Sequence, residues 1–170
     1  EISKKIFFKK LININIKKFK YNADSSFELK NIKIAIKKGE KVGIIGPTGS
    51  GKSTIVELLI NILYLRHGDI TIDNNSTRNF VNSWRSIIGY IPQKIYILED
   101  SLKNNICLND KYKNYQDKYF ISILQQVGLG NWYKKLPRGL KTNLNERGIN
   151  LSGGEIQRIG IARALVHNPE

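Results

Sequence analysis

Cysteine and methionine are almost absent from this chain of 170 residues, which has one cysteine, Cys107, and no methionine. A single cysteine excludes an internal disulfide and suits a reducing compartment, so we expect Cys107 to be a small buried apolar residue. No window of 18 apolar residues occurs and the N-terminus lacks the apolar core of a signal peptide, so we expect no membrane span in this stretch. His67 and His167 lie far apart and predict no metal site. Because an initiator methionine is missing, we expect the natural chain to begin further upstream.

Acidic residues are scarce too: 14 Asp and Glu stand against 28 Lys and Arg, a formal net charge of +14. Such a charge is often found in proteins that bind nucleic acid. Of the 28 cationic residues, however, 21 are lysine and 12 of these lysines precede position 42. A surface selected to grip phosphates more often uses arginine. We therefore interpret most of this charge as solvated surface, with a weak attraction to anionic membrane surfaces as the alternative.

Apolar and polar residues alternate over residues 4–37 and again at Ile70-Thr71-Ile72, which predicts an antiparallel sheet with a turn around Tyr21–Ser26. The short apolar runs Lys41–Ile45 and Ile87–Pro92 are typical of buried parallel strands. Helical spacing dominates from about residue 100 to residue 166. One helix is marked by Tyr119, Phe120, Ile123, Leu124 and Val127, and Gly128 is expected to end it.

The stretch from Gly46 to Thr54 fits the phosphate-binding pattern G-x-x-x-x-G-K-[ST]. Glycines at three positions allow a tight loop whose N–H groups turn toward a phosphate. Lys52 can reach the β- and γ-phosphates as a point charge, and the Ser53 hydroxyl can bind Mg²⁺. The predicted nucleotide-binding residues here are Gly46, Pro47, Thr48, Gly49, Ser50, Gly51, Lys52, Ser53 and Thr54.

The neighbours of this loop support the functional interpretation. The apolar run Lys41–Ile45 precedes it, and Ile55, Leu58, Leu59, Ile62 and Leu63 follow at helical spacing. Strand, loop and helix thus come in the order that a phosphate-binding loop requires. The alternative is a glycine-rich turn that happens to precede a helix.

A second motif, Leu151-Ser152-Gly153-Gly154-Glu155, has two interpretations that can both hold. Ser152 and Glu155 form the S-x-x-E pattern of a capping box, and Pro169 marks where the helix must already have ended. Two glycines at a helix N-terminus also leave bare N–H groups that can receive an anion. Ser152, Gly153 and Gly154 are therefore predicted to bind an anion such as a phosphate.

With the following residues, this motif reads L-S-G-G-E-x-Q-R-x-x-I-A-R-A-L, which resembles the signature sequence of the nucleotide-binding domains of ABC transporters. The resemblance covers nearly the whole chain. It implies an α/β P-loop NTPase core with an antiparallel β-subdomain and a helical signature subdomain, incomplete at the C-terminus. The implied divisions are a β-subdomain at 1–40 and 68–75, a P-loop core at 41–66 and 86–93, and a helical subdomain at 100–166.

The resemblance also implies roles for single residues. Tyr21 falls where the family has an aromatic side chain that stacks on adenine. Gln93 looks like the glutamine that contacts Mg²⁺ and whose loop meets the membrane-spanning part. Glu146 lies in a stretch, 136–148, that resembles the exporters, where this acidic residue belongs to a loop that senses the transmembrane domains. Without the resemblance, Tyr21 would be strand packing, Gln93 a turn residue and Glu146 a solvated charge.

Two positions depart from the exporter pattern: Asn145 replaces a usual glycine and Glu155 a usual glutamine. The first departure concerns how closely the loop around Glu146 follows the pattern. The second is a common variation in the wider family.

The resemblance implies the ATPase part of an ABC exporter on the cytoplasmic face of a membrane, with ATP and Mg²⁺ as cofactors. Its partners would be a second nucleotide-binding domain, packed head to tail, and transmembrane domains; the cargo would be lipid-linked or otherwise amphipathic. The family's catalytic carboxylates (the Walker B strand) and switch histidine would lie beyond Glu170. We therefore expect residues 1–170 to bind nucleotide without hydrolysing it, and the Ile44/Ile45 strand to be poorly covered.

Two alternatives stay open from the sequence. One is a soluble ABC ATPase that acts on ribosomes or nucleic acid, for which the positive charge would matter. Only 100 positions separate Lys52 from Ser152, without heptads, which excludes the long-armed DNA-repair form. The other alternative is a nucleotide-binding subunit that does not hydrolyse ATP.

Overall fold

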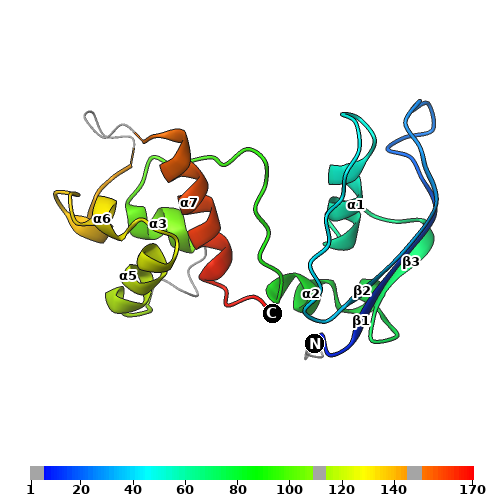
Figure 1. Ribbon diagram of the computed structural model, residues 1–170, viewed down its shortest axis with the longest axis horizontal. Helices are drawn as coiled ribbons and strands as arrows, with labels where there is room; N and C mark the ends of the chain where they lie inside the picture. Colours follow the sequence, from blue (N-terminus) through cyan, green and yellow to red (C-terminus); the bar gives the residue numbers. More distant parts are fainter. Residues whose placement is uncertain (1–5, 109–113, 145–150) are drawn as a thin grey trace. The chain divides into compact units, whose positions relative to one another are not determined.

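The computed structural model describes residues 6–108, 114–144 and 151–170 (Figure 1). The chain divides between Ile87 and Ile88 into two compact units. The described strands lie in the first unit, whereas the described residues of the second unit form helices and irregular segments. In the described part of the chain, no helix has the length and apolar content that crossing a bilayer requires.

The first unit contains a four-stranded antiparallel sheet in the order β2-β1-β3-β4. Its strands are β1 (Leu11–Phe19), β2 (Leu29–Lys37), β3 (His67–Ile72) and β4 (Asn75–Ser76). Ile14 of β1 lies opposite Ile34 and Ile70, and every second residue of β1 is buried from Ile12 to Ile16. The alternating pattern therefore puts one face of the sheet into a core, and the antiparallel sheet predicted from the sequence is confirmed.

A tight turn joins β3 to β4 at Asp73 and Asn74, both of which have positive φ angles (47° and 69°). The Asp73 carboxylate accepts hydrogen bonds of 2.7–2.8 Å from the N–H groups of Lys9, Lys10 and Leu11. Desolvation raises the pKa of Asp73, but these three donors outweigh it, so the pKa lies below its ordinary value. The turn thereby fastens the chain segment that leads into β1.

Helix α1 (Lys52–Leu59) follows the phosphate-binding motif and is shorter than the sequence pattern predicts. Asn61 adopts a left-handed conformation (φ 56°). The N–H groups of Asn61 and Ile62 bond to the carbonyl groups of Leu58 and Glu57 at 3.0 and 2.9 Å. These two bonds form a Schellman motif, which ends the helix and leaves Ile62 exposed. The helical spacing of Ile62 and Leu63 predicts a helix that continues beyond Leu59, and this prediction is wrong.

The first unit ends with a 3₁₀ turn (Thr77–Phe80) and helix α2 (Val81–Ser86). Trp84 of α2 is buried, and its Nε1–H donates to the carbonyl of Leu59 at 2.7 Å. This bond connects α2 to the C-terminal end of α1.

The two segments predicted to be buried parallel strands are not strands in this structure. Residues 41–45 and 88–92 have no regular structure, and the Ile45 side chain is 95% exposed. A parallel strand needs hydrogen-bonded neighbours and covered faces. In its own described unit, neither segment pairs with a strand. The prediction of buried strands was wrong here, whereas the expected poor covering of Ile44 and Ile45 is observed.

The second unit packs helices around one apolar core. The helices are α3 (Leu102–Cys107), α5 (Asp117–Gln126), α6 (Gly130–Tyr133) and α7 (Gly153–Leu165), with a 3₁₀ turn at Gly139–Lys141. Leu102, Phe120 and Ile159 are fully buried and belong to this core. Cys107 is also fully buried, as expected of a small apolar residue. Helix α5 ends just before Gly128, whose φ is +75°, so the expected stop at this glycine is confirmed.

Candidate functional site

The phosphate-binding motif forms an exposed loop between residue 45 and helix α1. Gly46, Gly49 and Gly51 all have positive φ angles, 155°, 82° and 92°. Such angles are strained for residues with a side chain, so the pattern of glycines matches the path of the backbone. The Ser50 N–H bonds to the Pro47 carbonyl at 3.3 Å, which closes the loop on itself. Thr48 lies within this turn and is exposed.

Gly51 is the N-cap of α1 and lies against the sheet. A Cβ atom at this position would lie 2.6 Å from Leu29 Cδ2 and 2.8 Å from Phe27 Cζ. Since real Cβ atoms do not approach other atoms so closely, only glycine fits here without movement of its neighbours. As a glycine, Gly51 supplies no side-chain acceptor to the first N–H groups of α1. The first N–H groups of α1 are therefore able to donate hydrogen bonds to an external anion.

Lys52 is the first residue of α1, and its side chain turns back onto the loop. Its Nζ donates to the carbonyl oxygens of Gly46 at 3.0 Å and Pro47 at 2.7 Å. The ammonium group is thus held at the loop, beside the N-terminal end of the helix, where it adds a full positive charge. Ser53 follows with an exposed hydroxyl group, as a metal or phosphate ligand would require.

Tyr21 lies beside α1 and is half exposed, at 54%. Its hydroxyl group lies 2.7 Å from the Oγ1 of Thr54, a buried residue of α1. The ring packs against Phe19 and Phe27, with centroid distances of 5.2 and 5.6 Å. Tyr21 therefore packs against the sheet, as strand packing predicts, while about half of the residue stays exposed.

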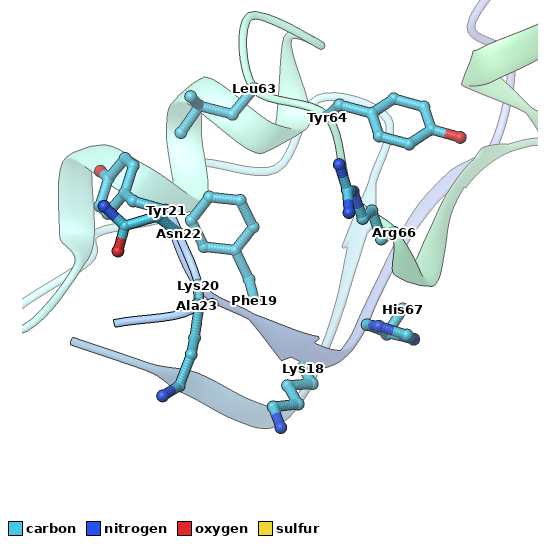
Figure 2. A pocket seen from close by; sticks show the side chains of 10 residues that line it. All are labelled: Lys18, Phe19, Lys20, Tyr21, Asn22, Ala23, Leu63, Tyr64, Arg66 and His67. Atoms are coloured by element: carbon cyan, nitrogen blue, oxygen red, sulfur yellow. The ribbon is translucent and has the colours of Figure 1, made fainter. Parts of the chain in front are cut away.

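Tyr21 also lines a pocket of about 810 Å³ in the first unit (Figure 2). The sequence did not single out the opposite wall, which comes from the segment after α1. The helical spacing predicts Leu63 within the helix, but the left-handed Asn61 redirects the chain, so Leu63, Tyr64, Arg66 and His67 line the pocket instead. The residues that line the pocket are Lys18, Phe19, Lys20, Tyr21, Asn22, Ala23, Leu63, Tyr64, Arg66 and His67.

The second motif opens helix α7 of the second unit. Ser152 Oγ accepts from the Glu155 N–H at 3.3 Å, and the Glu155 carboxylate accepts from the Ser152 N–H at 2.7 Å. The predicted capping box is therefore confirmed. Gly153 and Gly154 are exposed, and a Cβ at either would meet no atom within 4 Å. The packing of the described residues therefore does not require glycine at these two positions. What the missing side chains do provide is access to the backbone at the start of α7.

Gln93 is exposed and lies in an irregular segment of the second unit. This segment packs on α7: a Cβ at Gly160 would lie 2.2 Å from Ile95 Cδ1, and one at Gly89 would lie 3.3 Å from the Ala164 Cβ. The other predicted coupling residue, Glu146, lies outside the described residues, as does Asn145. The structure thus joins Lys52, Ser53, Thr54 and Tyr21 in one unit, and Gln93 and Ser152–Gly154 in the other.

Comparisons with known proteins agree with this geometry. The family model described as ABC transporter matches residues 29–170. The multidrug resistance-like ATP-binding protein MdlA of Escherichia coli is 38% identical over 94% of this chain and 27% of its own length. The protein of the same description from Buchnera aphidicola is 37% identical, again over 94% of this chain and 27% of its own.

Among solved structures, a bacterial Atm1-family ABC exporter with ATP bound is similar to 99% of this chain and 29% of its own, with a TM-score of 0.86 and 30% identity. The chain therefore spans just over a quarter of the length of these relatives. The family match over residues 29–170, together with the two phosphate-binding motifs, shows that this chain belongs to the ABC transporter family, as part of its ATP-binding domain.

Proposed function

We propose that this chain is the ATP-binding portion of an ABC exporter, in which ATP binding and hydrolysis drive transport across a membrane. The observation that carries the proposal is the loop at the start of α1, where Lys52 Nζ is held at the carbonyl groups of Gly46 and Pro47 beside uncapped N–H groups. A cation and convergent donors at one point form a site for the phosphates of a nucleotide.

The predicted nucleotide-binding residues of the first unit have distinct roles in this proposal. The backbone of Gly46–Gly51 surrounds the phosphates, with Pro47, Thr48 and Ser50 shaping the loop, and Lys52 neutralises their charge. Thr54 holds the Tyr21 hydroxyl, so that the exposed part of the ring lies ready for the adenine base. Ser53 supplies a hydroxyl oxygen atom to Mg²⁺, which when bound would neutralise phosphate charge. The loop of residues 46–50 fits the phosphates of ATP and their Mg²⁺ because it is exposed and open to an anion.

The second unit supplies an anion site that points to a partner. In the proposal, Ser152, Gly153 and Gly154 contact the γ-phosphate of ATP held by a second nucleotide-binding domain, packed head to tail. Exposed glycines at the start of α7 leave the N–H groups of that helix accessible. ATP then acts as a ligand that favours the closed dimer over the open one.

The remaining partners would be transmembrane domains, which would place this chain on the cytoplasmic face of a membrane. A relative from Rickettsia prowazekii, 37% identical over 89% of this chain, is described as a putative export ATP-binding/permease protein. Segments around Gln93 and Glu146 would contact the transmembrane part. An amphipathic cargo agrees with the multidrug descriptions of several relatives.

The experiment that tests the proposal is equilibrium binding of Mg²⁺-ATP to the purified chain and to Lys52→Ala. Losing charge-assisted hydrogen bonds to phosphate is expected to weaken binding about 10- to 100-fold. Lys33→Ala is the matched control, since Lys33 is an exposed lysine of β2, and it should leave affinity unchanged. Equal affinity of Lys52→Ala and the parent chain would refute the proposal.

A further inference from the structure

Asn105 of helix α3 is fully buried, which is uncommon for an amide side chain. Its Oδ1 accepts from the Leu98 N–H at 2.8 Å, while its Nδ2 donates to the Leu98 carbonyl at 3.0 Å. Nδ2 also lies 3.1 Å from the carbonyl oxygens of Asp100 and Ser101. The buried amide thus binds the backbone of residues 98–101 much as a neighbouring strand would.

Arg163 of helix α7 completes this arrangement from the opposite side. Its Nε donates to the Asn105 carbonyl at 2.6 Å, and its Nη2 donates to the Asn105 Oδ1 at 3.0 Å. Burial lowers the pKa of the Arg163 guanidinium, which indicates that the group is partly desolvated where it makes these bonds. The planar guanidinium uses two different nitrogens, Nε and Nη2, held in one fixed plane, whereas a lysine has a single nitrogen on a flexible stem and lacks this geometry.

Residues 98–102 are connected to both predicted coupling segments. Upstream, the Gln93 segment packs on α7 through Ile95 at Gly160. Downstream, the Leu102 N–H bonds to the Thr142 carbonyl at 2.8 Å and the Leu144 N–H to the Asp100 carbonyl at 2.9 Å. Residues 142–144 belong to the stretch 136–148, whose Glu146 lies outside the described residues. One short segment therefore joins the two coupling segments, and the Asn105–Arg163 pair joins that segment to the signature helix.

We propose that Asn105 and Arg163 are positioning residues that fasten residues 93–101 and 142–144 to helix α7, so that a shift of its Ser152–Gly154 end on nucleotide binding moves both segments together. This inference rests on the proposed function. Removing the Asn105 amide would leave the buried segment's Leu98 N–H without this partner, and removing the Arg163 guanidinium would take one donor each from Asn105 Oδ1 and the Asn105 carbonyl. Coupling of this kind needs a continuous path of packed and hydrogen-bonded groups, which this set of bonds provides within the second unit.

Hydrogen–deuterium exchange on the full-length transporter in lipid nanodiscs tests the inference, with and without Mg²⁺ and the non-hydrolysable analogue adenylyl imidodiphosphate. In the parent protein, nucleotide should slow exchange at residues 46–54 and 152–156, and also at 93–101 and 142–144. Arg163→Lys keeps the charge but loses the planar group whose two nitrogens make these bonds. This variant should retain the nucleotide effect at 46–54 and lose roughly fivefold of it at 93–101 and 142–144.

Asn105→Asp is the second variant, because a carboxylate would face the three carbonyl groups that the amide now binds. Asn131→Asp, at an exposed position of α6, makes the same chemical change and should leave all nucleotide effects intact. If Asn105→Asp fails to fold, Arg163→Lys still decides the question.

The outcomes separate the two proposals. If Arg163→Lys speeds exchange around α7 equally with and without nucleotide, and the nucleotide effect at 93–101 persists, the pair is merely structural and the inference is overturned. Protection at 46–54 without any change at 93–101 in the parent protein also overturns the inference alone. No protection at 46–54 in the parent protein refutes the proposed function itself.

Discussion

Alanine at Gly51 should destabilise the first unit by two separable effects, backbone strain and steric overlap. The φ angle of Gly51 is +92°, and its Cβ would overlap Leu29 Cδ2 and Phe27 Cζ. Two other glycines isolate these effects. Gly39 has a φ of +80° but open space around it, whereas Gly43 has neither a positive φ nor a close neighbour.

The expected magnitudes follow from these environments. Gly43→Ala should be neutral or stabilise slightly, by about 0.5 kcal/mol, because it lowers the entropy of the unfolded chain. Gly39→Ala should lower the free energy of unfolding by about 1 kcal/mol, since it places a side chain in the left-handed region. Gly51→Ala adds overpacking of roughly 1–3 kcal/mol, for a total of about 2–4 kcal/mol. Leu29 is buried in the sheet, which limits how far it can move away.

The assay is urea unfolding of the purified chain, followed by tryptophan fluorescence. Trp84 is buried in the first unit and bonds to the end of α1, so it reports on the helix that Gly51 opens. The chain has two tryptophans, and replacing the other one, Trp132→Phe, removes the signal of the second unit. All variants are compared in that background.

The three variants should therefore unfold in the order Gly51→Ala, Gly39→Ala and Gly43→Ala as urea rises. If Gly51→Ala costs no more than Gly39→Ala, Phe27 and Leu29 yield freely. Close approach of Phe27 and Leu29 would then not be the reason for the glycine, and backbone strain alone would account for it.

Three further predictions concern single contacts. Tyr21→Ala should weaken Mg²⁺-ATP binding, measured by calorimetry, by about 1–3 kcal/mol because stacking on the base is lost. Tyr21→Phe loses only the bond to Thr54 and should bind nearly as tightly as the parent chain. Equal effects of the two variants would mean that the ring does not contact the base. Ser152→Ala should destabilise α7 by about 1 kcal/mol because it removes the N-cap side chain. Glu155→Gln keeps a capping box, so the stability of its helix should lie within about 0.5 kcal/mol of that in the parent chain. Hydrogen-exchange rates of amides in the first turn of α7 measure both effects. Asp73→Asn should lower stability near neutral pH by about 1 kcal/mol or less after solvent screening. Because the pKa of Asp73 is depressed, its contribution is complete above the ordinary value of 3.8 and declines as pH falls below it, so the two unfolding midpoints should converge in acid; a constant difference down to pH values well below 3.8 would contradict this account.

Patterns within a few residues were reliable guides in this chain. The capping box of Ser152 and Glu155 and the stop at Gly128 follow from bonds between near neighbours, and both are observed as predicted. The strands β1 and β2 follow from alternation, since every second residue of β1 from Ile12 to Ile16 is buried. The roles assigned to Tyr21, Gln93 and Glu146 in nucleotide binding and coupling stay predictions.

Two segments show where local patterns fail. Residues 41–45 have the apolar run of a buried strand, yet Ile45 is 95% exposed, because a strand also needs a bonded neighbour that its own sequence cannot supply. The helical spacing from Ile55 to Leu63 continues past the real end of α1, because Asn61 enters the left-handed region and its motif closes the helix.

The sequence by itself determined the phosphate-binding loop, the cap of α7 and the alternating strands, because backbone geometry and side-chain period are set among neighbours along the chain. Only the tertiary structure decided which distant groups meet. Gly51 must be glycine because Phe27 and Leu29 press against it, and Asn105 meets Arg163 across 58 positions of sequence. Such contacts depend on how helices and strands pack against one another. The spacing of residues along a short stretch of sequence does not determine that packing.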